Sequence, residues 1–167
     1  MDVKEDVEKI IKRVLVAFPT IDLLINNAST FYPTPIEEIS EDHWEKLIGS
    51  NLKGPMFLIK GLGKKLKESE GSIINITDTN LSKGVANFSI YSAAKAGLEA
   101  ITKGLARELA PEIKVNAIAP GAFKTKMTKK IMQAGKNIAG ISEFNEAKKL
   151  KNGSVKKIFK LTRFSFF

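Results

Sequence analysis

The sequence predicts an α/β fold in which a parallel sheet carries helices on both faces. Short apolar runs alternate along the chain with longer segments whose apolar residues recur at helical spacing. The short runs cover residues 21–26, 72–77 and 113–118 and are typical of buried parallel strands. Strands that alternate with helices indicate crossover connections, and therefore a parallel sheet. At 167 residues the chain is expected to form one core.

Three helices are expected, over residues 3–18, 40–66 and 89–109. Pro19 ends the first helix, because proline cannot continue a helix without losing a hydrogen bond. Ser40 is a favourable N-cap for the second, since two acidic residues follow it in the first turn. Gly54-Pro55 lies inside this second helix and is expected to kink it.

The third helix carries a tyrosine and a lysine four residues apart, Tyr91 and Lys95. Residues at this spacing share one face of a helix, so the phenol and the ammonium can lie side by side. An ammonium favours the phenolate, which predicts a Tyr91 pKa below the ordinary value of about 10. Such a tyrosine can exchange a proton near neutral pH, as the reduction of a carbonyl or an imine requires. The same spacing also occurs on ordinary amphipathic surface helices.

Polar motifs accompany this pair in a fixed order. Asn26-Asn27-Ala28-Ser29 lies at the end of the first predicted strand, and Asn51 lies in the second helix. Asp78 comes directly after the second strand, and Pro120-Gly121 follows the third. The ordered set resembles the motifs of the short-chain dehydrogenase/reductase family, over the stretch from Asp2 to Met127. The resemblance implies a partial Rossmann-like doubly wound parallel sheet and an NAD(P)-dependent oxidoreductase.

Two departures from the usual family pattern narrow the resemblance. The family usually has serine where this chain has Asp78, and glycine where it has Ser29. Together with the segment at 30–35, they look like the pteridine reductase branch. Phe31 would then stack on a flat pterin ring, a contact worth about 0.5–1.5 kcal/mol beyond area burial. Phe31 can also be read as a packing aromatic, and Asp78 as a turn or cap residue.

The resemblance also implies roles for individual residues. Tyr91 would supply a proton, Lys95 would lower the Tyr91 pKa and hold the nicotinamide ribose, and Asp78 would orient the substrate or relay the proton. Asn51 would position Lys95 through water. NADPH is the expected cofactor and a pterin-like molecule the expected substrate. The residues expected to line the cofactor are Asp2, Asn27, Ala28, Ser29, Tyr91, Lys95, Pro120 and Gly121.

The printed sequence lacks the glycine-rich turn that opens nucleotide-binding folds of this kind. Gly61-Leu62-Gly63 is no substitute, since it lies in a predicted helix that no strand precedes. We therefore expect a fragment whose reductase domain covers residues 1–127, followed by a Lys-rich segment at 128–167 with no assigned structure. In the family's strand order, the strand at 21–26 would pair with an absent first strand, so we expect an open edge there and poor solubility.

Composition excludes several other kinds of chemistry. The chain has no cysteine and a single histidine, His43, so neither a metal site nor a Cys or Ser-His-Asp nucleophile is expected. Acidic neighbours suggest that His43 lies on the solvated surface. No apolar run is long enough to span a bilayer and no signal peptide is apparent, so a cytoplasmic location is expected.

Charge is concentrated at the end of the chain. The net charge is +9, and residues 122–167 carry twelve Lys and Arg against two acidic residues. A basic tail of this kind can bind nucleic acid, although no nucleic-acid motif accompanies it. Three alternatives therefore stay open beside the pterin reductase: a catalytically inactive remnant, a carbonyl reductase similar to 3-oxoacyl-carrier-protein reductase, and a basic binding module. By resemblance, the full-length protein is expected to form homo-oligomers.

Overall fold

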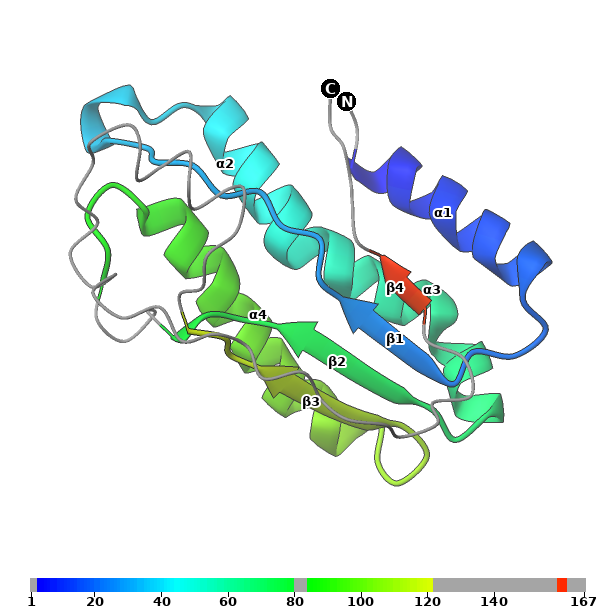
Figure 1. The fold of residues 1–167 in the computed structure, drawn as a ribbon. Coiled ribbons are helices and arrows are strands. Elements are labelled where there is room, and N and C mark those ends of the chain that lie inside the picture. The colour runs from blue at the N-terminus through cyan, green and yellow to red at the C-terminus, as the bar shows by residue number, and fades with distance from the viewer. Residues whose placement is uncertain (1–2, 80–83, 122–158, 162–167) are drawn as a thin grey trace.

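The computed structural model describes residues 3–79, 84–121 and 159–161. These residues form a parallel sheet with strand order β3-β2-β1-β4 and a set of helices packed against it (Figure 1). In chain order the elements are α1 (Val3–Ala17), β1 (Leu23–Asn26), the 3-10 turn η1 (Ile36–Glu38), α2 (Glu41–Ile48), the π-helix η2 (Gly49–Lys53), α3 (Gly54–Glu68), β2 (Ser72–Ile76), α4 (Ser89–Glu108), β3 (Lys114–Ile118) and β4 (Phe159–Leu161).

The strands and helices predicted from the sequence are confirmed to within about two residues at each end, which is the usual uncertainty of helix boundaries. Within each strand, buried and less buried residues alternate. Leu24, Ile73 and Val115 are buried, whereas their neighbours Leu23 and Ile74 are only half-buried. Because successive side chains point to opposite faces of a sheet, one face is covered more completely than the other.

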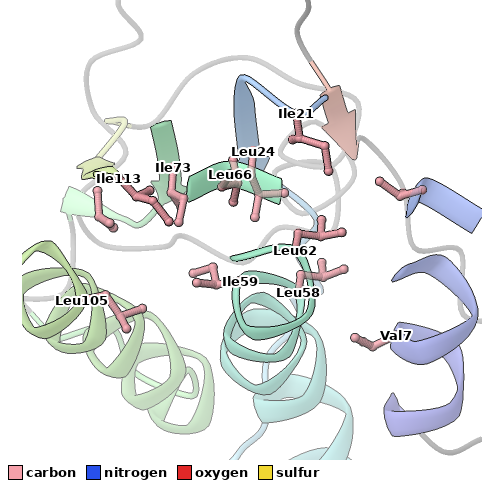
Figure 2. Packing of buried hydrophobic residues seen from close by; sticks show 12 residues of the cluster. Val7, Ile21, Leu24, Leu58, Ile59, Leu62, Leu66, Ile73, Leu105 and Ile113 are labelled. Atoms are coloured by element: carbon pink, nitrogen blue, oxygen red, sulfur yellow. The ribbon is translucent and has the colours of Figure 1, made fainter. Parts of the chain in front are cut away.

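The helices that cover the sheet lie together on one of its faces. Figure 2 shows α1, α3 and α4 on the same side of the strands, with the core between them. The crossovers β1-α3-β2 and β2-α4-β3 advance in the same direction along the sheet, and right-handed crossovers in one direction lie on one face. Among the residues that the structure describes, the second helical layer that we expected from the sequence is therefore not found.

Within the described residues, the larger core cluster contains twelve buried apolar residues, which come from three helices, the strands and their flanking turns. They are Val7, Val14, Ile21, Leu24, Leu58, Ile59, Leu62, Leu66, Ile73, Leu105, Ile113 and Val115. Leu24, Leu66 and Ile73 are fully inaccessible to solvent. This core fixes α3 and α4 against the strands, and both helices begin near the end of the sheet where the polar motifs gather.

The helix that was expected to run through 40–66 is interrupted by a π-helical turn. The Ser40 hydroxyl caps its start by accepting from the backbone N–H of His43, as predicted. Residues Gly49–Lys53 then form η2, in which the N–H of Gly54 donates to the carbonyl of Gly49. Pro55 lies in the first turn of α3, where a missing N–H is tolerated. The kink expected at Gly54-Pro55 stays a prediction, and the structure places a π-helical turn directly before it.

The edge of β1 that we expected to be open is covered. β4 pairs with it in parallel, with Leu24 opposite Phe159 and Asn26 opposite Leu161 (Figure 1). The expectation of an unpaired edge was therefore wrong, because a short strand from the basic segment supplies the missing backbone partners. The other residues of the segment at 128–167, and the predicted domain boundary at 127, lie outside the described residues. No helix within the described part of the chain is long and apolar enough to cross a membrane.

Candidate active site

The carboxyl ends of β1, β2 and β3 lie at the left of Figure 1, and predicted site residues follow each of these strands. The turn that holds Asn27 and Ala28 follows β1, Asp78 follows β2, and Pro120 follows β3. The start of α4 and the π-helix η2 pack together at the same end. In open α/β sheets this end binds ligands. Asp2, which was expected to contact the cofactor, lies outside the described residues.

Tyr91 and Asp78 are joined by a direct hydrogen bond. The Tyr91 hydroxyl donates to Oδ2 of Asp78 at 2.9 Å, and the Tyr91 side chain is buried. Burial raises the pKa of Tyr91 above its ordinary value, and the neighbouring Asp78 raises it further. The predicted lowering of this pKa was therefore wrong, because burial and the Asp78 carboxylate both disfavour the phenolate.

Lys95 lies on the same face of α4 as Tyr91, but its hydrogen bond goes elsewhere. Its ammonium donates to the backbone carbonyl of Ile76 at 2.8 Å and lies 6.0 Å from the centre of the Tyr91 ring. The side chain is only 3% exposed. Burial lowers the pKa of Lys95 to about 8, and Asp78 partly opposes this shift. The ammonium has three donors, so Lys95 retains donors for a ligand.

Asn51 is fully buried in the π-helix and holds the turn after β1. Its amide nitrogen donates to the carbonyls of Thr30 at 3.0 Å and Leu47 at 2.9 Å. Its amide oxygen accepts from the Ser29 hydroxyl at 2.6 Å. A second bond between the same two segments joins the hydroxyls of Thr30 and Ser50. The direct partners of Asn51 thus lie in the turn after β1, in α2 and in η2, and its expected link to Lys95 through water stays a prediction.

Phe31 belongs to an aromatic cluster at the start of α4. Its ring stacks on Phe88 with centroids 4.5 Å apart and planes inclined by 18°. It meets Tyr91 in a T-shaped arrangement at 4.7 Å. One face of the Phe31 ring is therefore used in packing against Phe88, as the interpretation of Phe31 as a packing aromatic predicts. Phe88 was not identified as a site residue from the sequence, although it lies three residues before Tyr91 and therefore one helical turn away.

The loop after β3 is tied to the end of β2. The backbone N–H of Thr79 donates to the carbonyl of Pro120 at 3.4 Å, and the Thr79 hydroxyl donates to the same oxygen at 3.2 Å. Thr79 is the residue after Asp78, so these bonds hold the Pro120-Gly121 loop beside the end of β2. Because Asp78 also bonds to Tyr91, the loop, Asp78 and the Tyr91-Lys95 pair lie at the same end of the sheet.

His43 departs from its predicted solvated environment. It is half-buried and packs against Tyr32, with ring centroids 5.8 Å apart. The Tyr32 hydroxyl and His43 Nδ1 are both buried and have no hydrogen-bond partner within the described residues. Burial also raises the pKa of Tyr32. No group of residues suited to a metal ion is found in the described part of the chain.

The comparisons with known proteins agree with this geometry. A profile of the short chain dehydrogenase family matches residues 1–136. The chain is 39% identical over 129 residues to a 3-oxoacyl-[acyl-carrier-protein] reductase from Synechocystis, covering 76% of this chain and 52% of that protein. It is 41% identical over 123 residues to NADPH-dependent aldehyde reductase 1 from Arabidopsis thaliana, covering 72% and 42%.

A solved structure supports the same assignment. The crystal structure of a short-chain alcohol dehydrogenase from Sinorhizobium meliloti matches with a TM-score of 0.72 and 32% sequence identity. The match covers 81% of this chain and 55% of that one. The chain therefore belongs to the short-chain dehydrogenase family of NAD(P)-dependent oxidoreductases. It spans about half the length of the curated relatives it matches.

Proposed function

We propose that this chain carries the catalytic half of an NADPH-dependent reductase that reduces a pterin-like C=N bond. The observation that carries the proposal is the 2.9 Å hydrogen bond between the Tyr91 hydroxyl and the Asp78 carboxylate, beside the ring of Phe31. A carboxylate can accept from the ring N–H and amino groups of a pterin. An aromatic ring next to it offers the flat ligand an apolar contact.

The residues present fit a nicotinamide cofactor. Lys95 keeps donors that can reach ribose hydroxyls, because one of its three N–H groups is bonded to Ile76. Asn27, Ala28 and Ser29 would line the cofactor beside η2, and Pro120-Gly121 would close over the nicotinamide. When bound, the cofactor supplies a hydride to the carbon of the C=N bond.

Tyr91 would deliver the proton that balances this hydride. Its raised pKa keeps the phenol protonated until the step, in which the O–H bond breaks as the substrate nitrogen gains its hydrogen. The phenolate that forms is disfavoured by Asp78 and favoured by the Lys95 ammonium on the same face of α4. Asp78 would hold the substrate ring or relay a proton from solvent to Tyr91 after the step.

A second candidate is reduction of a carbonyl group in a 3-oxoacyl thioester. It is supported by the Synechocystis relative, whose name states that activity, and by the Tyr91-Lys95 pair, which could equally protonate a carbonyl oxygen. Asp78 distinguishes the two candidates. A carboxylate is a suitable partner for ring N–H donors, but it offers no donor to a carbonyl oxygen.

The test compares both substrates in wild type, Asp78→Asn and Asp78→Ser. NADPH is supplied at millimolar concentration, and a parallel set fuses the amino-terminal unit of the Synechocystis relative to the chain. We expect a dihydropterin to be reduced faster than a 3-oxoacyl thioester, and Asp78→Ser to lower only the pterin rate, by about 10²-fold or more. Equal or faster thioester reduction by the wild type would overturn the pterin assignment and favour the second candidate. No turnover of either substrate in both sets would favour an inactive remnant.

A further inference from the structure

We propose that a chain of buried side-chain hydrogen bonds, from Asn26 through Asn75 to Thr102, positions α4 along the sheet and thereby places Tyr91 and Lys95. The proposal concerns the placement of the reactive side chains, so it rests on the function proposed above. All three side chains are at least 95% buried. Asn26 opens the Asn26-Asn27-Ala28-Ser29 motif, whereas Asn75 and Thr102 were given no role in the sequence.

In this series of hydrogen bonds, the donors point from β1 toward α4 and then along α4. Nδ2 of Asn26 donates to Oδ1 of Asn75 at 2.8 Å, and Nδ2 of Asn75 donates to the Thr102 hydroxyl at 2.9 Å. The Thr102 hydroxyl in turn donates to the carbonyl of Leu98 at 2.6 Å. Each amide uses its nitrogen toward the next member, so the donor and acceptor roles of Asn75 and Thr102 are fixed. The Asn26 amide oxygen has no partner among the described residues, and the chain begins there.

The first bond joins two strands and the second joins a strand to a helix. Asn26 and Asn75 are direct partners in the β1-β2 register, so their side chains meet only in this register. Thr102 belongs to α4, and its bond to Asn75 connects that helix to the sheet. This series of hydrogen bonds therefore links β1, β2 and α4, and residues of the candidate active site lie on α4 or directly after the two strands.

Among the described residues, the Asn75-Thr102 bond is one of three side-chain hydrogen bonds that join α4 to β2 or to the residues directly after it. Further along β2, the carbonyl of Ile76 holds Lys95, and beyond the strand Asp78 holds Tyr91. The helix residues occur in the reverse order, since α4 runs back along the sheet. Tyr91, Lys95 and Thr102 are spaced by four and seven residues, which places them on one helical face.

Apolar packing alone does not determine this placement. Contacts of Leu105 with the sheet are non-directional, so a small slide of the helix would change them little. The hydrogen bonds are directional, and a slide would leave the buried amide of Asn75 without a partner. The polar chain is thus the part of this interface that specifies where the helix lies.

The experiment measures the apparent pKa of Lys95 in the full chain, from its rate of amine labelling as a function of pH. The variants are Thr102→Val, which removes the hydroxyl at nearly constant volume, and Thr102→Ser, which keeps it. Thr102→Ala is included because it leaves space for a water molecule and is expected to fold if Thr102→Val does not. The matched control is Ile73→Val, which removes one buried methyl group from the same face of β2.

We expect Thr102→Val and Thr102→Ala to raise the apparent pKa of Lys95 from about 8 toward its ordinary value, by roughly one unit or more, as the released ammonium gains access to water. Thr102→Ser should match the wild type. Ile73→Val should lower the urea midpoint without moving the Lys95 profile. An unchanged profile in a folded Thr102→Val or Thr102→Ala protein would overturn the proposal, as would an equal shift in Ile73→Val.

The labelling experiment needs neither cofactor nor turnover. A chain that shows the shift but reduces no substrate would contradict only the proposed function. Reductase activity without the shift would contradict only the positioning role. The two proposals can therefore fail separately.

Discussion

Lys95 is the residue whose environment differs most from that of an ordinary helical lysine. It is almost completely buried, and its pKa is lowered to about 8 by desolvation. Its position on the face of Tyr91 could be predicted from the spacing of four residues. The direction of the Tyr91 pKa could not be predicted, because it depends on burial and on the bond to Asp78, which comes from a separate element.

This burial predicts how stability depends on pH. Lys95 loses its proton near pH 8 in the folded chain and near 10.5 in the unfolded chain, so the unfolded chain binds more protons between these values. The cost of burying the charge is fully present below pH 8 and is relieved as the pH rises, by at most about 1.4 kcal/mol per unit.

Urea unfolding between pH 7 and about 9.5 checks this expectation, below the range where tyrosines ionise at a pKa of about 10. The free energy of unfolding of the wild type should rise relative to Lys95→Met above pH 8. Lys103→Met is the matched control, because Lys103 lies on the same helix with its side chain 74% exposed in a pair with Glu99. Parallel curves for wild type and Lys95→Met would show that Lys95 is not buried as described.

At the scale of elements, the apolar runs predicted strands and helices well, because each run must be buried on one face. The π-helix was not predicted in its form. Pro55 indicated an interruption, but the i to i−5 bond from Gly54 to Gly49 depends on how the helix packs beside α4. That turn is what brings Asn51 to the backbone of Thr30.

Two glycines in α3 provide a matched test of helix packing. A Cβ at Gly61 would collide with the side chain of Ile11 in α1, whereas one at Gly63 would meet nothing within 4 Å. Gly63→Ala should stabilise the protein by about 0.5–1 kcal/mol through helix propensity.

Gly61→Ala gains the same propensity but overpacks the contact between α1 and α3, which costs typically about 1–3 kcal/mol. We expect it to be destabilising overall, since isoleucine has few alternative side-chain conformations. Urea unfolding of both variants measures the difference. Equal stability of Gly61→Ala and Gly63→Ala would contradict the close contact between Gly61 of α3 and Ile11 of α1.

For the whole molecule, the sequence predicted the parallel sheet but not its one-sided cover within the described residues or the strand that pairs with β1. The one-sided cover follows from the handedness of the crossovers, which depends on the strand order. The strand at 159–161 could not be predicted, because so short a run in a Lys-rich segment has no strand pattern of its own.

The 167-residue chain should bind NADPH weakly. Its sequence has no glycine-rich turn between a strand and a helix, which in such folds supplies backbone donors and a favourable dipole to the pyrophosphate. Losing a few charge-assisted hydrogen bonds, each worth about 1.5–3 kcal/mol, weakens a micromolar site by several orders of magnitude. Fluorescence titration measures the affinity, and a low micromolar dissociation constant would contradict this expectation.

The central claim is that Tyr91 donates the proton in a hydride-transfer reaction, and Tyr91→Phe tests it most directly. The substitution removes only the hydroxyl, so the ring can still pack against Phe31 and Phe88. The measurement is the rate of dihydropterin reduction at saturating NADPH, in the chain fused to the amino-terminal unit of the Synechocystis relative, with circular dichroism to confirm folding. We predict a fall of about 10²-fold or more, the range of general acid catalysis. A folded Tyr91→Phe protein that kept more than roughly a tenth of the wild-type rate would contradict the assignment of Tyr91 as the proton donor.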